Sequence, residues 1–278
     1  MTIKNILLSY NGLPSSEAAL RVALKMAEKY DAHLTGVLSH GPSRMSVALG
    51  PWVTPDLLES IRENEVAMRD KIAAGFRAGV AQAEKDRPGK YHWFDLGGDA
   101  DESLMQAARF YDIVVMGQYE SDAETAHLCP HPDTIALRSG RPVLIVPNGF
   151  DPAGMNGHAV LAWDGGRAAA VAMADAMPMM ENKSIVTVLT VGDGEASKRR
   201  EGMDVVAHLA RHGVMTDWKN VPRNGGGISG AILDMVDEKD AGLLIMGAYE
   251  HSKFTEELIG GVTKEVLRRS KVPVLMSH

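Results

Sequence analysis

The sequence predicts an α/β protein made of two copies of one unit, each a parallel sheet with helices on both faces. Two observations lead to this prediction. Short continuous apolar runs, typical of strands buried on both faces, alternate along the chain with segments of helical periodicity. The same series of segments also occurs twice, in the same order. Strands that alternate with helices form parallel sheets through right-handed crossovers, so each copy is expected to fold as one such layered unit.

The two copies share three matching pairs of segments. NILLSYNG is matched by AVLAWDGG, YDIVVMGQYES by AGLLIMGAYEHS, and LRSGRPVLIVP by LRRSKVPVLMS. The first pair places Asn11 and Asp164 153 positions apart, whereas the second places Gly117 and Gly247 only 130 apart. The first copy is therefore longer in its middle, where GPSRMSVALGPWVTPDLLESIRENEVAM predicts a Gly- and Pro-rich loop that leads into a helix.

The elements of each copy follow one order. In the first copy we expect a helix at 15–30 and strands at 6–10, 32–40, 91–96, 112–117 and 142–147. In the second copy we expect a helix at 166–180 and strands at 159–163, 184–191, 216–221, 242–247 and 273–278. Further helices connect the remaining strands. Between the copies, PNGFDPAGMNG is dense in Pro, Gly and Asn and indicates a linker, so the expected domains are 1–148 and 158–278.

Composition limits the classes of function. The length of 278 residues favours two domains of ordinary size. A formal net charge of −7 argues against nucleic-acid binding, which relies on basic surface. No run of about 18 apolar residues is present, so no membrane span is expected, and the first residues do not resemble a signal peptide. The single cysteine, Cys129, rules out an internal disulfide framework and is typical of the reducing cytoplasm.

Signatures of common enzyme classes are missing. The sequence contains no GxSxG, GxxxxGK[ST] or HExxH motif, and no SGGxDS motif of the related nucleotide-cleaving pyrophosphatases. Without a poised base or nucleophile, the sequence predicts no specific reaction.

Candidate binding residues of the second copy follow its strands, where ligands of such sheets bind. Asp164 follows the first strand, so its carboxylate could hydrogen-bond a base or a ribose; the alternative is a turn or helix-cap aspartate. Gly247 ends the fourth strand and lets the backbone approach a ligand closely. Gly260 and Gly261 precede a predicted helix, whose amino terminus favours anions, although a glycine pair can also simply shape a turn. Together these residues would converge on one crevice.

The spacing of these residues resembles a known motif. The pattern is similar to the phosphate motif of the universal stress protein family: Gly247 is followed by two residues and Glu250, and then by nine residues and the pair Gly260 and Gly261. That motif reads glycine, two residues, glycine, nine residues, glycine, and then a small or hydroxyl residue. The resemblance covers nearly the whole chain as two copies, and it implies a Rossmann-like, open five-stranded parallel sheet in each domain.

The resemblance also implies a ligand, which is ATP or another adenine nucleotide such as AMP, with Mg²⁺ as an accompanying ion. Asp164 would meet the adenosine, and the backbone around Thr190 and Val191 would flank the base. The phosphates would be surrounded by Gly247, Gly260, Gly261 and the amide of Val262, with Thr263 as a substitute hydroxyl.

Glu250 departs from the family motif, which has glycine at that position. A non-glycine residue costs about 1 kcal/mol if the position needs a left-handed backbone. Its carboxylate would also repel a triphosphate unless it points away or meets a metal ion. His251 and Lys253 could partly offset this charge, and Lys253 could itself reach phosphate, although both also fit a solvated loop. The second copy is therefore predicted to be a weakened nucleotide site.

The first copy departs further from the motif. Asn11 stands where the family has aspartate. Glu120 takes the same glycine position of the motif that Glu250 takes in the second copy. Pro130 and His131 stand where the second glycine pair belongs. Proline has no amide to offer an anion, so this copy is not expected to bind phosphate.

The segment HLCPH in the first copy suggests a second idea. His127, Cys129 and His131 alternate, so an extended strand would place all three on one side, as soft ligands for zinc or copper. The spacing matches no standard zinc motif and no fourth ligand is visible, so a structural loop is the preferred interpretation.

Three functional hypotheses follow. The preferred one is a cytoplasmic, stress-related binding or regulatory protein with one adenine nucleotide site in residues 158–278 and at most slow ATP hydrolysis. The second is a scaffold or partner-binding protein in which both sites have decayed. The third is an enzyme or carrier for another small ligand, with the long first-copy insertion as a lid. By the resemblance, the last strands of the two copies would pair across a pseudo-twofold, so one chain would mimic a dimer; association into a homodimer is a further option.

Overall fold

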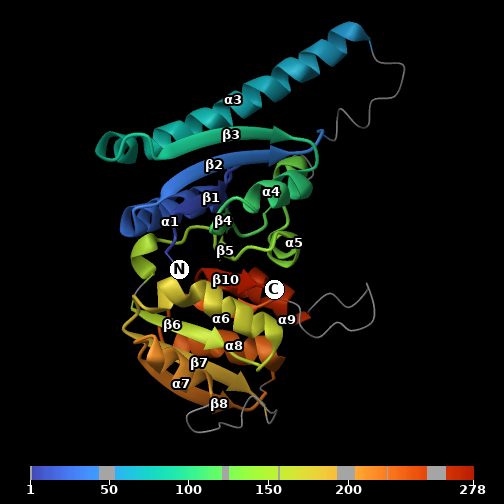
Figure 1. The fold of residues 1–278 in the computed structure, drawn as a ribbon. Coiled ribbons are helices and arrows are strands. Elements are labelled where there is room, and N and C mark those ends of the chain that lie inside the picture. The colour runs from blue at the N-terminus through green and yellow to red at the C-terminus, as the bar shows by residue number, and fades with distance from the viewer. Residues whose placement is uncertain are drawn as a thin grey trace.

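The computed structural model describes residues 2–43, 54–120, 125–155, 157–192, 204–223, 225–248 and 261–278. Strands and helices alternate along them as the sequence predicts. The ten strands of the described chain join one sheet in the order β3-β2-β1-β4-β5-β10-β9-β6-β7-β8. Figure 1 shows this sheet running through the whole molecule with helices on both of its faces. The predicted α/β class is therefore confirmed.

The elements agree closely with the segments that the apolar runs and helical periodicity define. The strands are β1 (Asn5–Ser9), β2 (His33–His40), β3 (Tyr91–Gly97), β4 (Ile113–Gly117), β5 (Val143–Val146), β6 (His158–Ala162), β7 (Ile185–Val191), β8 (Thr216–Val221), β9 (Leu244–Gly247) and β10 (Val274–Ser277). The α-helices are α1 (Pro14–Tyr30), α3 (Pro55–Asp86), α4 (Ala100–Ala108), α5 (Pro132–Arg138), α6 (Arg167–Met180), α7 (Val205–Arg211), α8 (Gly227–Glu238) and α9 (Gly261–Arg269). Two short 3-10 helices are η1 (Ala126–Leu128) and η2 (Pro152–Gly154).

Each half of the chain contributes five neighbouring parallel strands. In the first half β1 lies between β2 and β4, and in the second half β6 lies between β7 and β9. The two sets meet where β5 pairs antiparallel with β10. The two open sheets expected from the sequence are thus joined into one mixed sheet, because the backbone groups of β5 and β10 hydrogen-bond each other.

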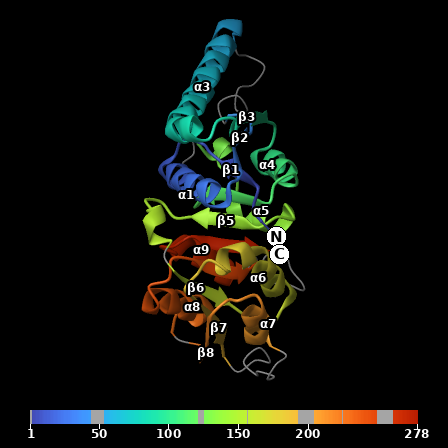
Figure 2. The ribbon, with the colours of Figure 1, turned by 60° about the vertical axis from the view of Figure 1, so that its left-hand side comes forward.

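The contact between β5 and β10 is symmetric. Its paired residues are Val143 with Met276, Leu144 with Leu275, and Ile145 with Val274. Leu144 and Leu275 occupy the same position of the repeat, 131 residues apart, so a local twofold axis passes between them. The predicted pairing of the last strands across a pseudo-twofold is confirmed. In Figure 2, β5 lies in the middle of an elongated molecule, with α3 toward one end and β8 toward the other.

Two layers of buried apolar side chains cover the two faces of the sheet. One layer packs under α1, α3, α6 and α7. The other packs under α4, α5, α8 and α9. Each layer contains residues from both halves of the chain, because the sheet between them is continuous.

The extra length of the first copy is largely a helix. α3 has 32 residues, whereas its counterpart α7 has seven. Phe76 of α3 packs on Gly36 of β2, where any side chain would overlap the Phe76 ring. The segment 44–53, in the loop predicted before this helix, lies outside the described residues. None of the helices in the described ranges is both long enough and apolar enough to cross a membrane.

Candidate functional site

The structure brings together three of the predicted binding residues in the second half. β6 lies between its parallel neighbours β7 and β9. Val191 ends β7, Gly247 ends β9, and Asp164 follows β6. Because the carboxyl ends of parallel neighbours meet at one edge of a sheet, the three residues lie along that edge.

Asp164 is exposed at this edge and forms a turn. Its Oδ1 accepts a hydrogen bond from the amide of Gly166 at 2.9 Å. Asn11 forms the same turn in the first half, where its Oδ1 accepts from the amide of Leu13 at 3.1 Å. Acceptance from the amide two residues on is a common structural use of both side chains. The turn that the sequence left as the alternative role is therefore present, and it holds Asp164 at the edge of the sheet.

Gly247 has a packing role that its sequence position did not reveal. A Cβ atom here would lie 2.6 Å from the carbonyl carbon of Ala168 and from the amide nitrogen of Ala169, in the first turn of α6. Gly117 has the same relation to Ser15 of α1, whose carbonyl carbon would also lie 2.6 Å away. Strand and helix approach so closely that only glycine fits. This approach sets the amino terminus of α6, which favours anions, beside the end of β9.

Helix α9 begins at Gly261, one of the predicted phosphate-binding residues. Gly261 is exposed, Val262 is half-buried and Thr263 is buried. Of these three residues, Gly261 is therefore the most exposed at the amino terminus of the helix. Lys253 and Gly260 lie outside the described residues, as do Glu250 and His251, so their roles stay predictions.

Helix α9 is held by contacts on both sides. Glu265 accepts from Ser229 of α8 at 3.0 Å and from Arg269 at 2.9 Å. These hydrogen bonds, with that from Arg269 the larger influence, lower the pKa of the Glu265 carboxyl. On the other side, the Gln118 amide that follows β4 donates to the carbonyl of Leu267. The helix that begins at Gly261 therefore also touches the first half of the chain.

In the first half, the carboxylate of Glu120 lies at the amino terminus of α1, which corresponds to the amino terminus of α6 in the second half. The half-buried Glu120 accepts a hydrogen bond from the amide of Ser15 at 3.1 Å through Oε1. Ser15 lies in the first turn of α1, after Pro14, so the carboxylate caps an amino terminus that would otherwise favour an external anion. Glu120 stands three residues after Gly117, as Glu250 stands three residues after Gly247.

The rest of the first crevice is also closed. Asn11 Nδ2 donates to the carbonyl of Leu128 at 3.2 Å and to Cys129 Sγ at 3.5 Å, which a carboxylate in its place could not do. A cavity of about 20 Å³ remains, lined among others by Ser15, Glu120 and Cys129. Small-molecule pockets span roughly 300–1,000 Å³. The geometry thus supports the expectation that the first copy takes no phosphate group here.

The metal arrangement considered for HLCPH rests on a wrong local structure. The segment is not an extended strand, because Ala126–Leu128 forms the 3-10 helix η1. Cys129 is buried beside Asn11, whereas His131 Nδ1 lies 3.0 Å from Asp101 Oδ2. In the parts of the chain that the structure describes, no group of three or more His, Cys, Asp and Glu side chains is placed to hold a metal ion.

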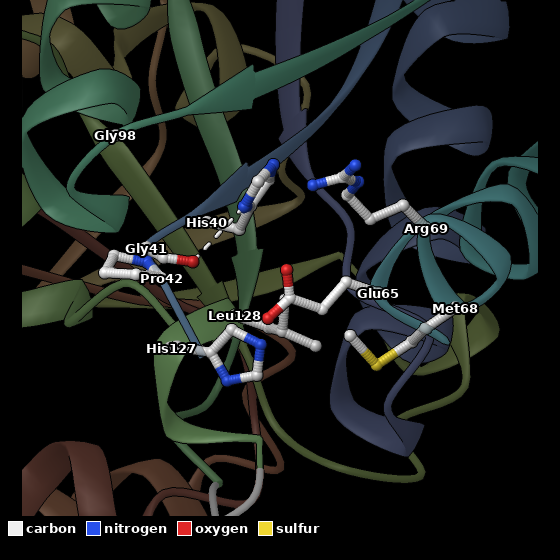
Figure 3. A pocket seen from close by; sticks show the side chains of 9 residues that line it. All are labelled: His40, Gly41, Pro42, Glu65, Met68, Arg69, Gly98, His127 and Leu128. Atoms are coloured by element: carbon white, nitrogen blue, oxygen red, sulfur yellow. Dashed lines mark hydrogen bonds between the residues drawn. The ribbon is translucent and has the colours of Figure 1, made fainter. Parts of the chain in front are cut away.

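The sequence reasoning missed a second, larger cavity in the first half. It has a volume of about 270 Å³ and lies between α3 and the carboxyl ends of β2 and β3. Figure 3 shows that Glu65, Met68 and Arg69 extend into it from α3, opposite His40 and His127. These residues are far apart in sequence and match no motif, so only the long insertion after β2 could have pointed to them.

The fold and the sheet edge define the class of the protein: an α/β protein whose candidate site lies at the carboxyl ends of parallel strands. The chain belongs to the universal stress protein family, because the sequence model of that family matches residues 2–147 and 222–278. A curated universal stress protein of Synechocystis sp. is 23% identical over 176 residues, which are 59% of this chain and 57% of that protein. The match with this relative thus spans little more than half of its length.

Solved structures share the fold over nearly the whole chain. A universal stress protein from Archaeoglobus fulgidus DSM 4304 is 15% identical with a TM-score of 0.73, over 99% of this chain and 96% of that chain. A functionally unknown protein from Pseudomonas aeruginosa PAO1 is 15% identical with a TM-score of 0.63, over 99% of this chain and 92% of that chain. At this identity the likeness concerns the fold.

Proposed function

We propose that this protein is a cytoplasmic, stress-related binding or regulatory protein with one adenine nucleotide site, in the second of two domains. The proposed domains are residues 1–148 and 158–278, each with five parallel strands. The observation that carries the proposal is the meeting of Asp164, Val191 and Gly247 at one sheet edge, in a chain of the universal stress protein family. The cytoplasm agrees with a chain whose single cysteine cannot form an internal disulfide.

In the proposed complex, Asp164 would meet the ribose of ATP or AMP, and the backbone of Val191 would flank the base. The phosphates would lie between Gly247 and the amino terminus of α9, against the amides of Gly260, Gly261 and Val262, with Lys253 and the Thr263 hydroxyl as further donors. Amides at a helix amino terminus favour anions without needing a catalytic side chain. We therefore propose binding, with or without Mg²⁺, and at most slow hydrolysis.

A second candidate function is a scaffold or partner-binding protein that has lost both nucleotide sites. The contact between Glu120 and Ser15 favours it, since a carboxylate there takes the place of a ligand anion. Ala168 is the counterpart of Ser15 in the repeat, so a Glu250 that behaved like Glu120 would compete with phosphate for the Ala168 amide.

Calorimetric titration of ATP and of AMP, with and without Mg²⁺, distinguishes the two functions. The variants are Asp164→Ala and Glu250→Gly, and Asn11→Ala is the matched control because it removes the same turn from the other half. Binding by the wild type that is lost in Asp164→Ala and kept in Asn11→Ala would support the nucleotide site. Binding by Glu250→Gly alone would support the scaffold, in which the crevice kept its shape and lost its use. Binding by neither protein would overturn the nucleotide proposal.

The pairing of β5 with β10 supports a further part of the proposal. We propose that one chain is an intramolecular pseudo-dimer, in which this contact takes the place of one between two single-domain chains. Mass measurement by light scattering during gel filtration would test it. A stable homodimer that persists on dilution would argue that a second contact surface exists.

A further inference from the structure

The larger cavity of the first half is built by the helix that this copy gained. It has a volume of about 270 Å³ and is lined by His40, Gly41, Pro42, Glu65, Met68, Arg69, Gly98, His127 and Leu128. Three of these residues come from α3, His40 ends β2, and the others follow β2 or β3 or belong to η1. The volume is just below the range of drug-sized pockets, which suits a small metabolite rather than a nucleotide.

Arg69 is positioned as an anchor for a carboxylate. Its Nε lies 3.5 Å from Asp95 Oδ2, and the other oxygen of that carboxylate lies 2.9 Å from His40 Nε2. Asp95 therefore orients both cavity residues. The terminal guanidinium nitrogens of Arg69 make no hydrogen bond within the described ranges, and Figure 3 shows the guanidinium reaching toward His40 across the cavity. A planar guanidinium with its terminal nitrogens directed at a cavity is suited to bidentate binding of a carboxylate or a phosphate.

The charge of Glu65 favours a carboxylate over a phosphate as the anion that Arg69 binds. It lies one turn before Arg69 on the same face of α3, lines the same cavity, and is held by a hydrogen bond from Ser43. A carboxylate here disfavours a doubly charged phosphate more strongly than a singly charged carboxylate. It also favours a cationic group on the ligand, one helical turn from the group that Arg69 holds. Neighbouring positive and negative side chains thus match a ligand with a neighbouring carboxylate and ammonium.

Beside His40 and His127, part of the cavity wall is apolar. Met68, Pro42 and Leu128 line it, so an aliphatic part of a ligand would be removed from water there. Met adapts its shape to irregular neighbours, so this wall can receive side chains of somewhat different shape.

We propose that this cavity binds a free α-amino acid, with the carboxylate on Arg69, the ammonium toward Glu65 and the side chain on the apolar wall. The site uses residues of the first half alone, so it does not depend on the nucleotide site proposed for the second half. It gives the long helix α3 a function, which is to supply the polar side of a pocket that the short α7 has no residues to build.

Thermal-shift screening of single L-amino acids, followed by calorimetry of the best one, tests this proposal. The comparison ligands are the 2-hydroxy acid with the same side chain, which lacks the ammonium group, and inorganic phosphate. We expect one amino acid or a few related ones to bind, the hydroxy acid to bind about tenfold more weakly, and phosphate not to bind. Equal binding of amino acid and hydroxy acid, binding of phosphate alone, or no binding by any amino acid would overturn the proposal.

Two variants assign the contacts. Arg69→Gln should weaken amino-acid binding by about tenfold or more, whereas Arg77→Gln, an exposed arginine on the same helix, should leave it unchanged. Glu65→Gln should remove the preference for the amino acid over the hydroxy acid, and it serves as the second test if Arg69→Gln unfolds. Unchanged binding in Arg69→Gln, or an unchanged preference in Glu65→Gln, would refute the assignment.

Discussion

Replacement of Gly247 by alanine tests whether this residue serves packing as well as ligand binding. The added Cβ would lie 2.6 Å from two backbone atoms of the first turn of α6, whereas ordinary contact begins at 3.4 Å. The helix and strand would therefore have to separate by about 0.8 Å, the difference between those two distances. Backbone atoms cannot rotate away as a flexible side chain can, so α6 must move as a unit in a closely packed interior.

Overpacking of this kind costs about 1–3 kcal/mol. We expect Gly247→Ala to lower the free energy of unfolding by about 2 kcal/mol within that range, as measured by urea denaturation. Gly261→Ala is the matched control, because it lies at the other predicted phosphate position and its added Cβ meets no atom of the described residues within 4 Å. Alanine also favours a helix over glycine by up to about 1 kcal/mol, so Gly261→Ala should leave stability unchanged or raise it.

One result would refute this reasoning. If Gly247→Ala unfolds at the same urea concentration as the wild type, the close approach of β9 to α6 is not a constraint on this position. If that variant also lost ATP binding seen in the wild type, Gly247 would be conformationally free in the protein alone and needed only by the ligand.

Two further predictions concern charge. Glu120→Ala should cost about 1–2 kcal/mol of unfolding free energy by losing the hydrogen bond at the amino terminus of α1. Glu120→Gln should cost less, because an acceptor remains while only the charge is lost; equal losses in urea denaturation would contradict this order. Burial, with Lys29 and Lys25 nearby, lowers the pKa of Lys183 from 10.5 to about 8. The unfolded chain thus binds a proton between these pH values that the folded chain does not, so this residue destabilises the fold fully below pH 8 and less as pH rises toward 10.5. Lys183→Met should therefore be more stable than the wild type at pH 7. The shift corresponds to at most about 3 kcal/mol of unfolding free energy, and solvent screening of this partly exposed residue reduces that to about half. If the advantage of the variant does not shrink by pH 10.5, the assignment is contradicted.

The strands could be predicted from the sequence because nearly all are buried on both faces. Such strands are short continuous apolar runs, and the segment TDWKNV even coincides with β8, although that strand is only half-buried. The internal repeat then fixed the order of elements in both halves. The joining of the two sheets came from the family resemblance, since pairing between backbone groups leaves little trace in side-chain patterns.

The candidate site was predictable only in part, because its geometry depends on contacts between distant segments. The sequence indicated that Asn11 replaces an aspartate, but it did not reveal that its amide donates to Leu128 and Cys129. The contact from Glu120 to Ser15 joins positions 105 residues apart, so no local pattern encodes it. For the HLCPH segment, the extended strand on which the metal alternative depended is absent, because Ala126–Leu128 forms a 3-10 helix beside Asn11.

The joining of β5 to β10 also changes how the molecule meets its own copies. Two separate five-stranded sheets would have four outer strands, each with a row of unpaired amide and carbonyl groups that can recruit another chain into an aggregate. In the joined sheet, β3 and β8 are the outer strands among the residues that the structure describes. Because both partners of the joint belong to one chain, dilution cannot separate them, in contrast to an association between molecules. The edges of β5 and β10 are therefore covered equally well at any protein concentration.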